Sequence, residues 1–152
     1  MTLDSKNKKI VHAHIDRSHY KVEMNAGGHQ LFGDEPEGSG GSDAGPDPYD
    51  YLLMSLGSCT AMTVRMYADH KEWPVEEVFV ELLHHKVHAE DCENCDKKTS
   101  KVDHIEKDVI IVGDLTEKQK DRLLEVSERC PVHRTLQSDI EITSQLSHKE
   151  SV

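Results

Sequence analysis

The chain has 152 residues and a formal net charge of -11, from 29 Asp and Glu residues against 18 Lys and Arg residues. This acidic balance disfavours nucleic acids and anionic membrane surfaces as partners, because like charges repel. The N-terminus lacks the apolar region of a secretory signal, and no stretch approaches the roughly 20 apolar residues of a membrane span. We therefore expect one cytoplasmic domain over residues 1–152, with four cysteines that serve redox or metal chemistry before structural disulfides.

The first third of the chain has the composition of short strands followed by a loop. Residues 9–16 and 20–24 are strand-like, and the glycines in residues 26–28 predict a bend before residues 29–32. These segments predict an N-terminal meander. Residues 33–47 are rich in Gly, Pro, Ser and acidic side chains, which predicts a long flexible loop.

A long helix is predicted after this loop. Asp47 suits the N-cap and Pro48 the first helical position, and the helix is expected to run to about His70. Its middle, residues 52–64, carries apolar or small side chains on every side. That pattern is typical of a helix that is buried on most sides.

The next segment predicts a strand hairpin. Residues 75–86 alternate between apolar and polar side chains, and residues 104–112 form a second long strand. The Cys- and His-rich residues 84–104 are expected at the hairpin tip. This segment is treated below as a candidate metal site.

The last part of the chain predicts a helix and a strand. Thr116 with Gln119 resembles a capping box, and the helix that it starts is expected to end near Arg129, before Pro131. Residues 138–145 alternate as a final strand. Strands and helices in this order predict an α+β fold rather than a regular βαβ alternation.

Two well-separated cysteines are the candidate chemical groups. A reactive cysteine must be a thiolate, and Cys59 lies ~18 Å along the helix from Asp47, beyond the reach of the helix dipole. Cys130 lies near the C-terminal end of a helix, where the dipole disfavours a thiolate. The alternative reading is that these are buried core cysteines. A cation that stabilises the Cys59 thiolate must come from elsewhere, and the candidates are Arg17, Arg65 and Arg134.

These features resemble the OsmC/Ohr family. The resemblance is carried by the helix that begins at Asp47-Pro48 and reaches Gly57-Ser58-Cys59-Thr60, and by Cys130-Pro131 after the second helix. It implies an α+β OsmC-like fold in which antiparallel sheets pack around a long buried central helix in an intertwined homodimer. By resemblance to the peroxidase branch, Cys59 attacks an organic hydroperoxide, Cys130 resolves the product as a disulfide, and Arg17 is the nearest candidate for the activating arginine.

The resemblance implies a thiol-dependent peroxidase-like enzyme in oxidative-stress defence. Its substrate is expected to be a small, partly apolar peroxide, its reductant a dithiol that is lipoyl-linked in the peroxidase branch, and no cofactor is required for catalysis. The chain departs from that branch at Tyr49, where the branch has a glutamate ten residues before the attacking cysteine. Two alternatives stay open: thiol-based acyl transfer or hydrolysis with His133 as base, and a dimer that binds a small ligand or zinc.

The hairpin tip carries a possible zinc site formed by His85, His88, Cys92 and Cys95. Two imidazoles and two thiolates complete a tetrahedral zinc site, which would be structural because four protein ligands leave no open position. On a strand His85 and His88 face opposite sides, and His104 on the returning strand is a further candidate for the tip. A local dithiol or disulfide at Cys92 and Cys95, or a solvated loop, is the alternative.

Overall fold

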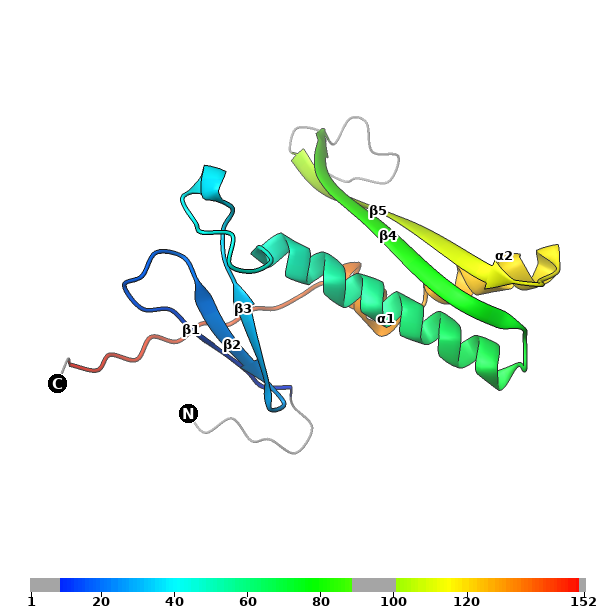
Figure 1. The fold of residues 1–152 in the computed structure, drawn as a ribbon, viewed down its shortest axis with the longest axis horizontal. Helices are drawn as coiled ribbons and strands as arrows, with labels where there is room; N and C mark the ends of the chain where they lie inside the picture. Colours follow the sequence, from blue (N-terminus) through cyan, green and yellow to red (C-terminus); the bar gives the residue numbers. More distant parts are fainter. Residues whose placement is uncertain (1–8, 89–100, 151–152) are drawn as a thin grey trace. The chain divides into compact units, whose positions relative to one another are not determined.

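A computed structural model of the chain describes residues 9–88 and 101–150. Three strands are followed by one long helix, a pair of long strands and two shorter helices (Figure 1), which confirms the predicted α+β class. The chain divides into two compact units, residues 1–54 and 55–152. Within the described ranges, no helix is both long enough and apolar enough to cross a bilayer.

The N-terminal unit contains a small antiparallel sheet. Its strands β1 (Val11–His14), β2 (Val22–Ala26) and β3 (His29–Gly33) pair in the order β1-β2-β3. The turn between β2 and β3 consists of Gly27 and Gly28, whose φ angles are 57° and 84°. Glycine adopts such angles without steric cost, so the tight hairpin forms at this point. The predicted meander is confirmed, although β1 and β2 each begin two residues later than predicted.

The loop after β3 is organised around the buried carboxylate of Asp34. It contains one turn of 3-10 helix, η1 (Glu37–Ser39). The carboxylate accepts hydrogen bonds from the backbone N–H groups of Glu35 at 2.8 Å, Ser42 at 3.1 Å and Ala44 at 3.2 Å. Burial alone would raise the pKa of Asp34, but these donors outweigh it and hold the pKa below its ordinary value.

Helix α1 (Pro48–His70) has the bounds that the sequence predicts. Its first turn is closed reciprocally: the Asp50 N–H donates to Asp47 Oδ1 at 2.9 Å, and the Asp47 N–H donates to Asp50 Oδ2 at 3.2 Å. This is the geometry of a capping box with an aspartate in place of the usual Glu or Gln. The prediction of a helix that starts at Asp47-Pro48 is therefore confirmed.

The predicted burial of α1 on most sides is wrong for the single chain. One stripe at intervals of four residues is buried, namely Leu56, Thr60, Val64 and Ala68. Elsewhere on the helix, Met62 is 64% exposed and Met66 is 70% exposed. The helix is apolar as predicted, but within one described chain only one stripe of its surface is buried.

The C-terminal unit is built on a long antiparallel hairpin of β4 (Val75–His88) and β5 (Lys101–Gly113), which confirms the predicted hairpin. Helix α2 (Glu117–Ser127) follows, and its predicted capping box between Thr116 and Gln119 is present. The hydrophobic core joins this hairpin to α1 and α2. Its buried members are Val64, Ala68, Val75 and Leu123, with Tyr67, Trp73, Val78, Val109, Ile111 and Leu115 packed around them.

Gly57 of α1 makes room for the Leu82 side chain of β4. A Cβ atom on Gly57 would lie 2.8 Å from the Leu82 Cδ1 atom, closer than two carbon atoms can pack. Because Gly57 has no Cβ, the end of the Leu82 side chain packs directly against the helix at this level. Cys59 lies two residues further along the same helix.

The structure differs from the prediction at two places in the C-terminal region. A short helix, α3 (Pro131–Leu136), follows α2 directly and was not predicted. The strand predicted over residues 138–145 is wrong, because this segment is irregular and pairs with none of the described strands. A strand requires a partner edge for its backbone groups, and alternation alone does not supply one. Consequently Ile142 is 83% exposed and Leu146 is 93% exposed.

Candidate functional site

Cys59 and Cys130 lie together in the C-terminal unit. Cys59 is partly exposed in the middle of α1, whereas Cys130 is fully buried in front of α3. Both cysteines carry free thiols. Cys59 is close enough to Cys130 to contribute to the lowering of its thiol pKa. The fold therefore brings the two predicted redox cysteines near each other from distant parts of the sequence.

Cys130 is the N-cap residue of α3. Its Sγ atom accepts a hydrogen bond from the His133 backbone N–H at 3.3 Å and lies 3.5 Å from the Thr60 hydroxyl oxygen. The expectation that Cys130 experiences only the unfavourable C-terminal end of a helix is therefore wrong. Pro131, which suits the first position of a helix, was the sequence signal for this second helix start.

Lys107 is the cation of the site. It projects from β5, and its ammonium group lies within hydrogen-bonding distance of three acceptors. These are the Ser127 carbonyl oxygen at 2.8 Å, His133 Nδ1 at 3.1 Å and the Thr60 hydroxyl oxygen at 3.3 Å. An ammonium group has three N–H donors, so this arrangement satisfies all of them. Thr60 thus connects the Lys107 ammonium to the Cys130 sulfur.

The surroundings of Cys130 favour its thiolate. Burial alone would raise the pKa of the Cys130 thiol, but its hydrogen bonds with Thr60 and with the donating His133 N–H, together with Cys59 and the positive charge of Lys107, lower it. Together these contributions hold the pKa of Cys130 below its ordinary value. Burial in turn lowers the pKa of Lys107, although the nearby cysteines and Glu128 oppose that shift.

His133 contributes as a neutral imidazole. Burial lowers its pKa, and the positive charge of Lys107 lowers it further. An ammonium group can only donate, so His133 Nδ1 accepts from Lys107 and the ring proton lies on Nε2. The ring accepts a hydrogen bond from Lys107, and the His133 backbone N–H donates to the Cys130 sulfur.

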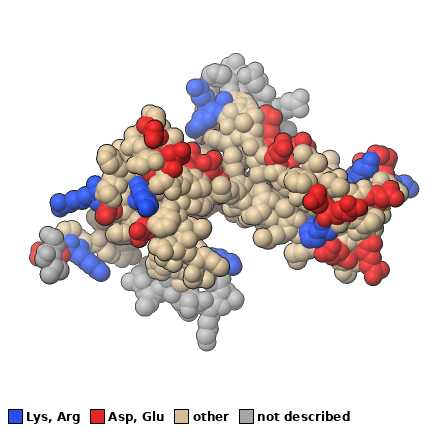
Figure 2. All heavy atoms as spheres, viewed as in Figure 1, with Lys and Arg blue, Asp and Glu red and all other residues tan. Residues whose placement is uncertain are grey.

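His133 also lines a hollow of about 430 Å³ on the surface of the unit, together with Glu125, Glu128, Arg129 and Gln137. Figure 2 shows Asp and Glu side chains gathered over the α2 end of this unit. The hollow is therefore polar and opens near acidic groups. It suits the passage of water and protons better than the binding of an apolar substrate.

The sequence suggests three arginines as cations that could stabilise the Cys59 thiolate, and the structure describes each of them. Arg65 donates to the Val75 carbonyl at 2.6 Å and to the Glu76 carbonyl at 2.9 Å, so its guanidinium group holds the start of β4. Arg134 is exposed on α3. Arg17 lies between β1 and β2 of the N-terminal unit, and its predicted role stays a prediction. Lys107 was missed, although it lies between Ile105 and Val109 in the half-buried series of β5, where a charged side chain is a signal for a functional role.

The predicted zinc ligands fall in two groups. Cys92 and Cys95 lie outside the described residues. His88 pairs with Lys101 at the end of the hairpin, and His85 pairs with His104. The four-residue site therefore stays a prediction, whereas the placement of His104 beside His85 is now established.

Comparisons with known proteins agree with this fold. An OsmC-like protein from Mycoplasma pneumoniae is 20% identical, with a TM-score of 0.68 over 87% of this chain and 89% of its own. An organic hydroperoxide resistance protein from Legionella pneumophila is 16% identical, with a TM-score of 0.61 over 88% and 91%. One from Elizabethkingia anophelis, solved with bound thiocyanate, is 15% identical, with a TM-score of 0.64 over 91% and 94%. At these identities the likeness shows the fold.

No curated protein matches the sequence. The family model of OsmC-like proteins, however, matches residues 40–145. This range contains α1 with Cys59, both strands of the long hairpin, and α2 and α3 with Cys130. Because the match covers most of the chain and the fold agrees with it, the protein belongs to the OsmC-like family.

Proposed function

We propose that the protein reduces organic hydroperoxides with Cys59 and Cys130 as a redox pair. The observation that carries this proposal is that both cysteines lie near the ammonium group of Lys107, which Thr60 connects to the Cys130 sulfur. Two of the structures that share its fold are named as organic hydroperoxide resistance proteins, which supports the same reading. The role of the pair in oxidative-stress defence follows from this proposal.

The first step is attack of the Cys59 thiolate on the outer oxygen of the hydroperoxide. An S–O bond forms, the O–O bond breaks, and the alcohol leaves after it takes up a proton. Cys59 is oxidised to a sulfenic acid and the peroxide is reduced. Cys59 takes this role by resemblance to the family and because it is partly exposed, whereas Cys130 is fully buried.

The second step is attack of the Cys130 thiolate on the Cys59 sulfenic acid. An S–S bond forms and the sulfenic oxygen leaves as water. The surroundings that lower the pKa of Cys130 increase the fraction of thiolate available for this attack. A dithiol then reduces the disulfide and becomes a disulfide itself. A reducing cytoplasm is the compartment in which such a cycle is sustained.

Intact-mass spectrometry provides the direct test. One equivalent of an organic hydroperoxide, added to the reduced metal-free protein, is expected to remove two hydrogens. Peptide mapping is expected to locate the new disulfide between Cys59 and Cys130. Oxidation confined to Cys92 and Cys95, or no Cys59–Cys130 disulfide, would contradict the proposed mechanism.

The proposal includes an intertwined homodimer, as the family resemblance implies. Its support is the apolar surface of the single chain, which includes exposed Met62 and Met66 on α1 and Phe79 on β4. Met62 and Met66 lie four residues apart on the same face of α1, and an exposed apolar patch of this kind is typical of an interface. A second chain also offers a partner edge to the alternating residues 138–145.

We expect light scattering after size exclusion to give about twice the chain mass of 17.2 kDa. Substitution of both Met62 and Met66 by glutamate is expected to shift the protein toward the monomer, because two charges would be buried in the interface. A double variant at exposed Lys118 and Asp121 of α2 is the matched control. A monomeric wild-type protein at micromolar concentration would rule out the homodimer.

A further inference from the structure

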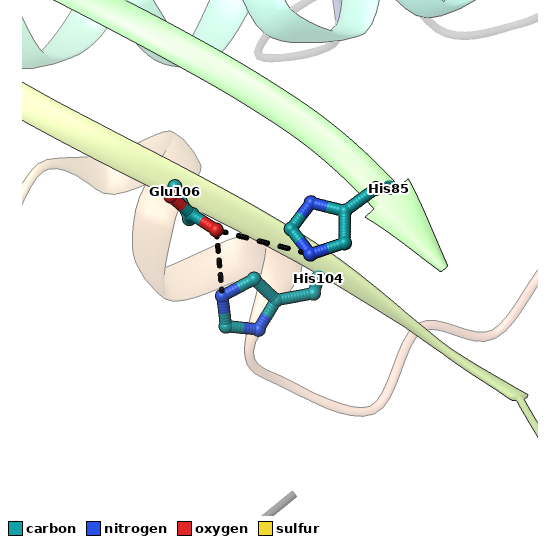
Figure 3. A group of neighbouring side chains, drawn as sticks. All are labelled: His85, His104 and Glu106. Carbon is teal, nitrogen blue, oxygen red and sulfur yellow. Dashed lines mark ion pairs between the residues drawn. The ribbon is translucent and has the colours of Figure 1, made fainter. Parts of the chain in front are cut away.

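Two histidines and a glutamate converge on one face of the long hairpin (Figure 3). His85 on β4 pairs directly with His104 on β5, so their side chains lie on the same face of the sheet. Glu106 lies two residues beyond His104 on β5 and therefore shares this face. One ligand atom from each of the three residues lies within 4.8 Å of the others. The pairing register of β4 and β5 therefore brings these three potential metal ligands together.

The Glu106 carboxylate lies to one side of the two imidazoles, which are neighbours with ring centroids 5.1 Å apart, and faces one nitrogen of each. Its Oε1 atom lies 3.8 Å from His85 Nε2 and 3.9 Å from His104 Nε2. These separations exceed a hydrogen bond, which spans roughly 2.7–3.2 Å. Ligands of a tetrahedral zinc ion at about 2.0–2.1 Å are themselves separated by roughly 3.3 Å. The three groups therefore need only a small contraction to bind an ion between them.

His85 also has an incomplete set of partners. Its Nδ1 atom is buried and has no hydrogen-bond partner among the described residues. Buried polar atoms in native proteins are usually satisfied by protein, water or a bound ion, so such an atom needs an explanation. The nitrogen that faces Glu106 is Nε2, so Nε2 is the candidate ligand atom. The unsatisfied Nδ1 is then the nitrogen that an outer partner, such as a water molecule, would hold when Nε2 binds a metal ion.

The surroundings of the cluster favour a cation. A hollow of about 360 Å³ on the sheet is lined by the carboxylates of Glu81, Glu106 and Asp108, with Leu82, Leu83 and Lys107. The exposed fractions of the three ligand side chains, which are 40% for His85, 47% for His104 and 58% for Glu106, leave the cluster open to solvent. His84 on the neighbouring position pairs with Asp103 instead, at 2.8 Å, and is not part of the cluster. An ion can therefore reach the cluster and is attracted to it.

We propose that His85, His104 and Glu106 form a divalent transition-metal site, with Zn²⁺ as the preferred ion. Imidazole and carboxylate ligands suit zinc, and three protein ligands leave one coordination position for water or a further donor. The ion would tie β4 to β5 at the level of the His85–His104 pair. This assignment differs from the predicted zinc site at the hairpin tip, because His104 and Glu106 replace Cys92, Cys95 and His88.

Zinc titration of the reduced full-length protein by calorimetry tests the site. The wild-type protein is expected to bind one equivalent of Zn²⁺ through this cluster. His104→Gln and Glu106→Gln are each expected to weaken this binding by roughly 10- to 100-fold or to abolish it. Both substitutions lie at exposed positions and preserve side-chain size, and circular dichroism checks that the variants remain folded.

The controls distinguish zinc bound at this site from zinc bound by thiols. His70 is an exposed histidine at the end of α1, and the variant His70→Gln is expected to bind zinc as the wild type does. The double variant Cys92→Ser/Cys95→Ser is expected to retain zinc bound at His104 and Glu106. The proposal is overturned if neither His104→Gln nor Glu106→Gln weakens zinc binding. It is also overturned if the wild-type protein binds no Zn²⁺ when the Zn²⁺ concentration reaches the millimolar range.

Discussion

Substitution of Cys59 by serine is expected to abolish the reduction of organic hydroperoxides, with a loss of at least about 10³-fold in kcat/KM. A serine hydroxyl is far less nucleophilic than a thiolate and cannot pass through a sulfenic acid. Consumption of tert-butyl hydroperoxide in the presence of a dithiol measures this loss. No peroxide-dependent change in mass is then expected at Cys130, because no sulfenic acid forms for it to attack.

Cys130→Ser is expected to behave differently from Cys59→Ser. The first oxidation of Cys59 should survive, so one equivalent of peroxide is consumed and a sulfenic acid accumulates on Cys59. A sulfenic-acid-specific label, located by peptide mapping, detects this species. Ser58→Ala, at an exposed neighbour on α1, is the matched control and should stay within about twofold of wild type. Full loss of the first oxidation in Cys130→Ser, with retention in Cys59→Ser, would reverse the two roles.

The local features of this chain were predictable because they depend on neighbouring residues. Asp47 and Pro48 start α1, and Thr116 with Gln119 starts α2, through contacts within one helical turn. The glycine turn before β3 follows from backbone angles that only glycine adopts freely. Each of these signals acts over three or four residues, so no knowledge of the tertiary structure was needed.

The site could be predicted only in part, because it depends on contacts across the fold. The sequence offered Cys59 and Cys130 as candidates but not the distance between them. That distance follows from the packing of α1 on β4 and from the turn between α2 and α3, where Cys130 is the N-cap of α3. The strand predicted at residues 138–145 failed for a related reason, since alternation indicates the ability to pair but supplies no partner.

Lys107 also bears on the departure from the peroxidase branch at Tyr49. The glutamate of that branch helps to hold an arginine against the thiolate. Lys107 is a different cation, which a backbone carbonyl, an imidazole and a hydroxyl hold in place beside Cys130. Its position therefore does not depend on the residue at position 49.

Lys107→Met is therefore expected to slow formation of the Cys59–Cys130 disulfide at pH 7 by about tenfold. The positive charge of Lys107 favours the deprotonated form of Cys130, so its removal raises the pKa of Cys130 and leaves less thiolate. The pH profile of the rate should move to higher pH, and the rate should recover in alkaline buffer. Rapid-quench mass spectrometry of a single turnover across pH measures both effects.

A structural role for Lys107 would give a different result. Methionine fills the space of the lysine stem but leaves the Ser127 carbonyl and His133 Nδ1 without their donor, so Lys107→Met is expected to lower the melting temperature whichever role Lys107 has. Lys107→Arg keeps the charge and should retain most of the rate at pH 7, and Lys86→Met removes an exposed charge from the same hairpin as the matched control. A slow rate that persists at alkaline pH would show that Lys107 supports the fold rather than the thiolate. The charge of Lys107 stabilises the deprotonated form of Cys130. Raising the pH therefore restores the rate of disulfide formation only if Lys107 acts through its charge.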